Sequence, residues 1–144
     1  MVARLNILNM EKELIKFISV NKILDKLKLD TLSGNDKYKI LKISRKIKLI
    51  VKEFEEFKQD IIDKHINTDE FKDKYQIKDS SEEANKYIED IKSEINNLLL
   101  IEATSNKTLE IDPIPEELFV KIIELNNLSV NDSLLLEEIL LNKE

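Results

Sequence analysis

Hydrophobic residues recur through the middle of the chain at alternating steps of three and four positions. Such spacing places side chains along one stripe of a helix, and it predicts one continuous helix from about Lys37 to His65. An apolar stripe left in water forfeits roughly 25 cal/mol for each Å². We therefore expect it to be covered by other helices, as in a coiled coil, or by another copy of the chain, and the pattern leaves both open. This candidate interaction seam consists of Ile40, Ile43, Ile47, Ile50, Phe54, Phe57 and Ile61.

A turn precedes the long helix. The run from Ser33 to Asp36 combines residues that favour turns, and Gly34 is the one glycine in the chain. This glycine is expected at a positive φ, where residues with a Cβ are disfavoured. Asn35 or Asp36 is then expected to cap the helix.

Two further segments carry the helical period. One helix is predicted over about 10–27, and another over 80–98, opened by a capping box of Ser80 and Glu83. The residues between the long helix and this one, 66–79, lose the period and indicate a loop or irregular segment. An antiparallel hairpin of the second and third helices, with the first packed alongside, covers all three apolar faces.

The helical spacing of hydrophobic residues ends after Leu98. Two short β-prone runs, 99–103 and 108–111, predict a small β-hairpin, the alternative being a helix that continues past Leu100. Short helices are expected after Pro115 and after a capping Ser129. The predicted fold class is mainly α, an antiparallel long-helix hairpin or bundle with a small β-hairpin and two short C-terminal helices.

Length and composition fit one domain over residues 1–144, a helical bundle over 10–98 followed by the smaller elements of 99–144. The chain is 42% hydrophobic and 36% charged, with one glycine, two prolines and no cysteine. That balance indicates an amphipathic, helix-rich protein rather than a disordered chain or a membrane span. No signal peptide or transmembrane segment is recognisable, so we expect a protein that folds in a cytoplasm and does not enter a membrane.

The sequence carries no recognisable catalytic or metal-binding motif. His65 is the single histidine and stands among charged residues at the end of the long helix, where solvation is the simpler interpretation. Without cysteine there is no thiolate nucleophile or cysteine-bound metal. No glycine-rich phosphate loop and no nucleophile elbow is present. We expect no enzymatic activity, no metal and no cofactor.

Charge is unevenly distributed. Residues 1–66 contain 15 Lys/Arg against 10 Asp/Glu, whereas residues 67–144 contain 8 against 19. Such a chain could associate head to tail, or fold its acidic half over its basic half. The long helix begins basic and ends acidic, an order that opposes its dipole unless a partner offsets the cost. Its candidate basic surface comprises Lys39, Lys42, Arg45 and Lys46.

This basic surface could bind nucleic acid, because clustered cations can neutralise phosphates. The acidic total charge, the lack of an aromatic platform and the isoleucines that commit one side of the helix to packing argue against it. A solvated or partner-facing surface is the preferred interpretation.

The order of these segments resembles a family of small tailed-bacteriophage proteins of unknown function, over about residues 14–140. The resemblance implies a viral origin, in a host of low GC content, and assigns no functional residue. It is carried by Asn21 to Leu27, by Lys37-Tyr38-Lys39-Ile40 at the start of the long helix, by Glu53 to Phe57, by Tyr75 to Asp79, by a Leu100-Ile101-Glu102 strand and by Leu136 to Ile139.

On this basis we expect a non-enzymatic structural or assembly protein of a phage, a helical adaptor in the neck or tail region. Its partners would be phage proteins or further copies of itself, and it would be made in the host cytoplasm and enter the virion. The alternative is a host-takeover or anti-defence inhibitor that acts by stoichiometric binding, since an acidic protein can occupy a basic groove. Binding of nucleic acid through residues 37–52 is the weaker alternative.

Overall fold

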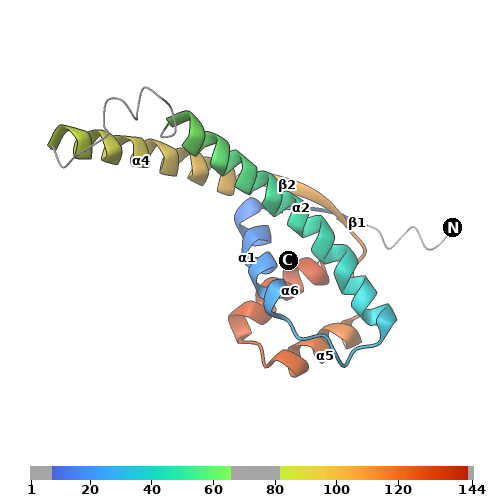
Figure 1. Ribbon diagram of the computed structural model, residues 1–144. Helices are drawn as coiled ribbons and strands as arrows, with labels where there is room; N and C mark the ends of the chain where they lie inside the picture. Colours follow the sequence, from blue (N-terminus) through green and yellow to red (C-terminus); the bar gives the residue numbers. More distant parts are fainter. Residues whose placement is uncertain (1–7, 66–81, 143–144) are drawn as a thin grey trace. The chain divides into compact units, whose positions relative to one another are not determined.

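The computed structural model describes residues 8–65 and 82–142 (Figure 1). The described residues are mainly helical, with five helices and a two-stranded antiparallel sheet, which confirms the predicted fold class. No described helix has the length and hydropathy that a bilayer-spanning segment needs. In chain order the elements are β1 (Leu8–Glu13), α1 (Leu14–Lys26), α2 (Gly34–His65), α4 (Glu82–Ala103), β2 (Asn106–Ile111), α5 (Glu116–Asn126) and α6 (Val130–Leu140).

The chain divides into two compact units. Unit 1 contains Met1–Val51 together with Asn106–Glu144, and unit 2 contains Lys52–Ser105. The division falls inside α2 and groups the N-terminal part of the chain with its C-terminal part. It differs from the division between 10–98 and 99–144 expected from the sequence, while a single domain over the whole chain stays a prediction.

Unit 1 is built around one hydrophobic core to which β1, α1, α2, β2, α5 and α6 all contribute. Within this unit α1 and α5 both pack against α6. A fully buried valine, leucine, isoleucine or phenylalanine side chain contributes roughly 1.5–3 kcal/mol to the free energy of folding, relative to an exposed one. The members with no exposed surface are Phe17, Val20, Ile47, Ile111, Ile122, Leu136, Ile139 and Leu140.

The sheet of unit 1 joins a strand near the N-terminus to a strand that follows α4. β1 and β2 are antiparallel, with Leu8 opposite Ile111 and Glu13 opposite Asn106. A two-stranded antiparallel sheet is present, as predicted, but the prediction that residues 99–103 form the partner of β2 is wrong, since its partner is β1. Local sequence cannot reveal this pairing, because the core that aligns the strands is assembled from distant segments.

The first helix starts later than predicted. Residues 10–13, assigned to that helix from the sequence, lie in β1, and α1 begins at Leu14. The residues Met-Glu-Lys-Glu are good helix formers, so local propensity favoured the wrong state. Pairing with β2 and burial of Met10, which is 2% exposed, override that propensity.

Helix α2 begins at Gly34, before the predicted start at Lys37. The capping residue is Ser33 rather than Asn35 or Asp36: the Asp36 amide donates to Ser33 Oγ at 3.2 Å, and the Lys37 amide donates to the Ser33 carbonyl. The predicted positive φ at Gly34 is wrong, since this glycine has no positive φ and belongs to the first helical turn.

Helix α4 continues through the residues expected to form a strand. Residues 99–103, including the Leu100-Ile101-Glu102 segment, are helical to Ala103. Two hydroxyls then bind carbonyls of the last turn, Thr104 Oγ1 at 2.9 Å from the Leu100 oxygen and Ser105 Oγ at 2.6 Å from the Glu102 oxygen. The same two carbonyls also accept the backbone amides of Thr104 at 3.0 Å and Ser105 at 3.1 Å, so each hydroxyl adds a second hydrogen bond at the end of the helix.

Unit 2 consists of two antiparallel helical segments, the C-terminal part of α2 and α4 (Figure 1). Its core among the described residues is small: Ile61, Ile91 and Ile95 are buried, and Phe57 and Leu99 pack against them. The predicted connection 66–79 and the capping box at Ser80 lie outside the described residues.

The seam predicted from the heptad pattern is covered from within the chain at most of its positions. Ile40, Ile43 and Ile47 are buried in the core of unit 1, and Ile50 packs against it. In unit 2, Ile61 is buried and Phe57 packs against its cluster. Phe54 is partly buried.

The two short C-terminal helices are confirmed. Pro115 immediately precedes α5, whose first turn carries Glu116 and Glu117. Ser129 caps α6, accepting from the Asp132 amide at 3.1 Å. Asn127, at the end of α5, adopts the left-handed conformation, with φ 48°.

Truncating the centre of the unit 1 core should lower its stability strongly. Ile47 is fully buried, so Ile47→Ala is expected to reduce the free energy of unfolding by about 3 kcal/mol. The matched control is Leu41→Ala in the same helix, where the side chain is 46% exposed and a loss below about 0.5 kcal/mol is expected. Urea unfolding measures both, and equal losses would show that the buried face of α2 is misassigned.

Candidate functional site

A groove on unit 1 brings together residues that are far apart in the sequence. It has a volume of about 580 Å³, with α2 as one wall and the end of β2 and the residues after it as the other. The α2 wall consists of Tyr38, Lys39, Lys42, Ile43, Arg45, Lys46 and Leu49, and the second wall of Glu110, Ile111, Asp112, Pro113 and Pro115.

All four residues of the candidate basic surface line this groove: Lys39, Lys42, Arg45 and Lys46 are exposed on the α2 wall. Lys46 Nζ donates to the Glu110 carbonyl at 2.7 Å and so bridges the two walls. Lys42 Nζ lies 5.3 Å from the centroid of the Tyr38 ring, a cation–π contact.

None of these four cations pairs with a carboxylate in the described part of the chain. Ion pairs there involve Lys12, Lys16 and Lys48 instead. The groove therefore presents cationic groups to solvent, available to an acidic partner.

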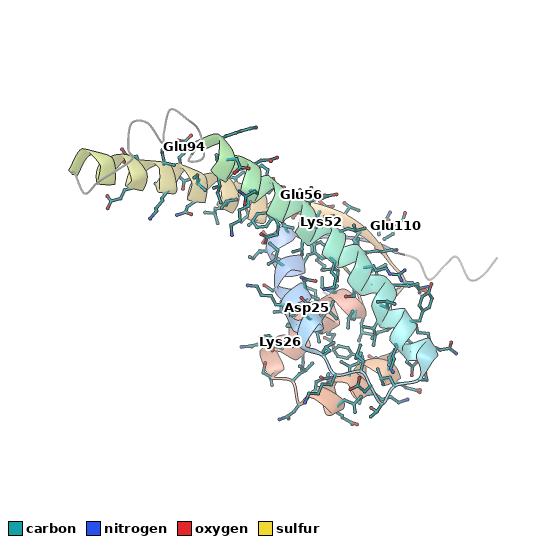
Figure 2. The ribbon with its side chains drawn as sticks, viewed as in Figure 1. Asp25, Lys26, Lys52, Glu56, Glu94 and Glu110 are labelled. Carbon is teal, nitrogen blue, oxygen red and sulfur yellow. The ribbon has the colours of Figure 1, made fainter. Side chains whose placement is uncertain are left out.

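The second wall carries the opposite charge and apolar surface. Glu110, labelled in Figure 2, and Asp112 are exposed carboxylates there. Between them Ile111 is fully buried, while Pro113 is partly buried and Pro115 exposed. Carboxylates in the lining of the groove repel a polyphosphate, whereas a protein surface can present both charge signs and apolar groups to such a groove.

Helix geometry explains why the basic residues share one wall. Positions 39, 42 and 46 follow steps of three and four, so their side chains project in similar directions from α2. The buried isoleucines fix the rotation of the helix, because Ile40, Ile43 and Ile47 must face the core. Sequence reasoning identified this wall but missed the second, which reaches α2 only through long-range packing.

A second cluster of charges ties α6 to the N-terminal elements of unit 1. Glu138 Oε1 accepts from Lys16 Nζ at 2.6 Å and from Lys12 Nζ at 3.1 Å. Burial tends to raise the pKa of Glu138, but the two lysines outweigh it and leave this pKa below its ordinary value. The hydrogen bond with Glu138 raises the pKa of Lys16.

Both shifts stabilise the charged forms. A general acid or base is tuned toward neutral pH, whereas the pKa values of Glu138 and Lys16 move away from it. We therefore interpret this cluster as a structural ion-pair network. Within residues 8–65 and 82–142, no group of three or more His, Cys, Asp or Glu side chains is placed to hold a metal ion.

Compared with known protein families, with curated proteins and with solved structures, the chain shows no match.

Removing the charge of Glu138 should make stability less sensitive to acid. Because its folded pKa is lowered, the contribution of this group is complete above the ordinary value of 4.5 and is lost as pH falls through the lowered folded pKa. At neutral pH, Glu138→Gln is expected to cost about 1 kcal/mol, and the difference from the unmodified chain should shrink below pH 4.5.

Urea unfolding from pH 7 to pH 3 measures this difference. Glu124→Gln on the exposed face of α5 is the matched control and should change stability little at any pH. A Glu138→Gln deficit that stays constant as the pH is lowered would contradict the assignment.

Proposed function

We propose that this chain is a non-enzymatic assembly protein of a bacteriophage, an adaptor that binds other proteins through the groove of unit 1. The observation that carries the proposal is the groove itself. It combines unpaired cations on α2, carboxylates on the opposite wall and exposed apolar surface from Tyr38 and Leu49, which are 52% and 62% exposed. These are the chemical components of a protein interface.

Exposed apolar side chains elsewhere support a protein that works through its surfaces. In unit 2, Leu100 and Ile101 are exposed on α4. In unit 1, Val130 and Leu134 are exposed one helical turn apart on α6. Apolar residues grouped in this way are typical of surfaces that other proteins cover.

The phage setting rests on the resemblance in the order of segments from Asn21 to Ile139. A place in the neck or tail region is part of the same proposal. The rival function, a stoichiometric inhibitor of a host protein, would use the same kind of groove. Whether the protein is present in purified phage particles therefore distinguishes the two functions.

The protein should be a stoichiometric component of purified phage particles. Quantitative mass spectrometry of gradient-purified virions is expected to find it at a fixed ratio to the major capsid protein. Reversing groove charges with Lys42→Glu and Arg45→Glu should lower that ratio by at least about tenfold, because each replaces attraction by repulsion.

Lys121→Glu with Glu124→Lys, on the exposed face of α5, is the control and should leave incorporation unchanged. Absence from particles, with recovery from infected cells on a host protein, would overturn the assembly role in favour of the inhibitor.

A further inference from the structure

A second stripe runs along the exposed face of α2. Its positions are separated by steps of four, three, four, four, three and four residues, so they share one side of the helix. All of them are exposed, in contrast to the buried isoleucine stripe. The members of this exposed stripe are Tyr38, Lys42, Arg45, Leu49, Glu53, Glu56 and Asp60.

Charges in the exposed stripe are arranged as a mirror image about Leu49. Arg45 and Glu53 lie four residues to either side of Leu49, and Lys42 and Glu56 lie seven residues to either side. Cations precede the central leucine and anions follow it. Reversing the direction of the helix therefore exchanges each cation with an anion at the same distance from the centre.

We propose that the groove of unit 1 binds α2 of a second copy of this chain, running antiparallel. Glu53 and Glu56 of the second copy then meet Arg45 and Lys42, and Leu49 meets its own counterpart. The inference rests on the proposed protein-binding role of the groove and names its partner.

Charge along α2 supports this partner. Like charges are grouped along the exposed stripe, with its cations before Leu49 and its anions after it. An antiparallel second helix brings these opposite charges together. In the described residues Lys42, Arg45, Glu53 and Glu56 form no ion pair within the chain, so all four are free to meet a partner.

The groove supplies the contact surface for the basic half of the stripe. Tyr38, Lys42, Arg45 and Leu49 belong to its α2 wall, while Glu56, labelled in Figure 2, projects from the part of α2 that belongs to unit 2. A volume of about 580 Å³ accommodates several side chains of a docked helix rather than the whole helix. The exposed tyrosine and leucine add apolar contact to the ion pairs.

The same surface of both copies is used if the pair closes on a two-fold axis, as in most homodimers. Acidic positions of each copy then occupy basic positions of the other. A closed pair has the mass of two chains, which light scattering measures directly.

Charge exchange tests the proposed pairing in the full-length chain. An all-acidic variant carries Lys42→Glu and Arg45→Glu, and an all-basic variant carries Glu53→Lys and Glu56→Lys. Each alone should self-associate at least about tenfold more weakly than the unmodified chain, because the pairings of positions 42 with 56 and 45 with 53 become repulsive. An equimolar mixture should restore the two-chain mass, as should one chain carrying all four changes.

Restoration in the mixture supports the proposal, since misfolded variants could not recover by mixing. Circular dichroism of each variant checks the fold, and Lys121→Glu with Glu124→Lys is the control that should not alter the mass. A monomeric unmodified chain at about 100 µM, or two-chain mass unaffected by either variant, would overturn the proposal.

Cross-linking tests the direction of the pair. Because the chain has no cysteine, Leu49→Cys introduces the sole thiol. An antiparallel pair centred on this position should give a disulfide-linked dimer on mild oxidation, whereas Val120→Cys, exposed on α5, should not. No dimer from Leu49→Cys, or equal cross-linking of both, would overturn the antiparallel arrangement.

These experiments use the isolated protein, whereas the assembly role is tested on phage particles. A monomeric chain found in virions would refute self-pairing alone. A paired chain absent from virions would refute the assembly role alone. Retention of the unmodified chain on duplex DNA, lost in the all-acidic variant, would assign the groove to nucleic acid and overturn the second copy as its partner.

Discussion

Burial of the isoleucine stripe of α2 is the constraint on which the structure depends. Ile40, Ile43 and Ile47 are covered by the core of unit 1, and Ile61 by α4 in unit 2. The helices α1, α5 and α6 are held in place in the same way, because they too bury apolar faces in the core of unit 1. The rotation of α2 about its axis follows from this packing, and with it the set of side chains left on the exposed face.

That exposed face carries the charged side chains that we propose bind a partner. The basic residues of α2 cannot turn inward without exposing the isoleucines, so they remain on the groove wall opposite Glu110 and Asp112. These cations precede the carboxylates Glu53 and Glu56 along the helix, and a partner with the opposite order of charges would bring unlike charges together. The fold thus assigns one side of α2 to stability, and we propose that the other side serves recognition.

Features set by local periodicity could be predicted from the sequence. The long helix, the two C-terminal helices and the Ser129 cap follow from side-chain spacing and capping chemistry within a few residues. The basic wall of the groove follows from the same periodicity. The pairing of β1 with β2 could not be predicted, because residues 10–13 favour a helix on their own and become a strand only by pairing with β2. For the same reason the second wall of the groove had no signal in the sequence around Lys42 and Arg45.

The most direct measurement compares the methyl groups of Ile47 and Leu49, two residues apart on α2, by NMR with a soluble paramagnetic probe over a range of protein concentrations. Ile47 is fully buried and Leu49 is 62% exposed in the single chain. Ile47 should be shielded at every concentration, and Leu49 should be attenuated in dilute solution and become shielded as copies pair. Attenuation of Ile47 as strong as that of Leu49, or exposure of Leu49 that does not change with concentration, would contradict this division of α2 between core and partner.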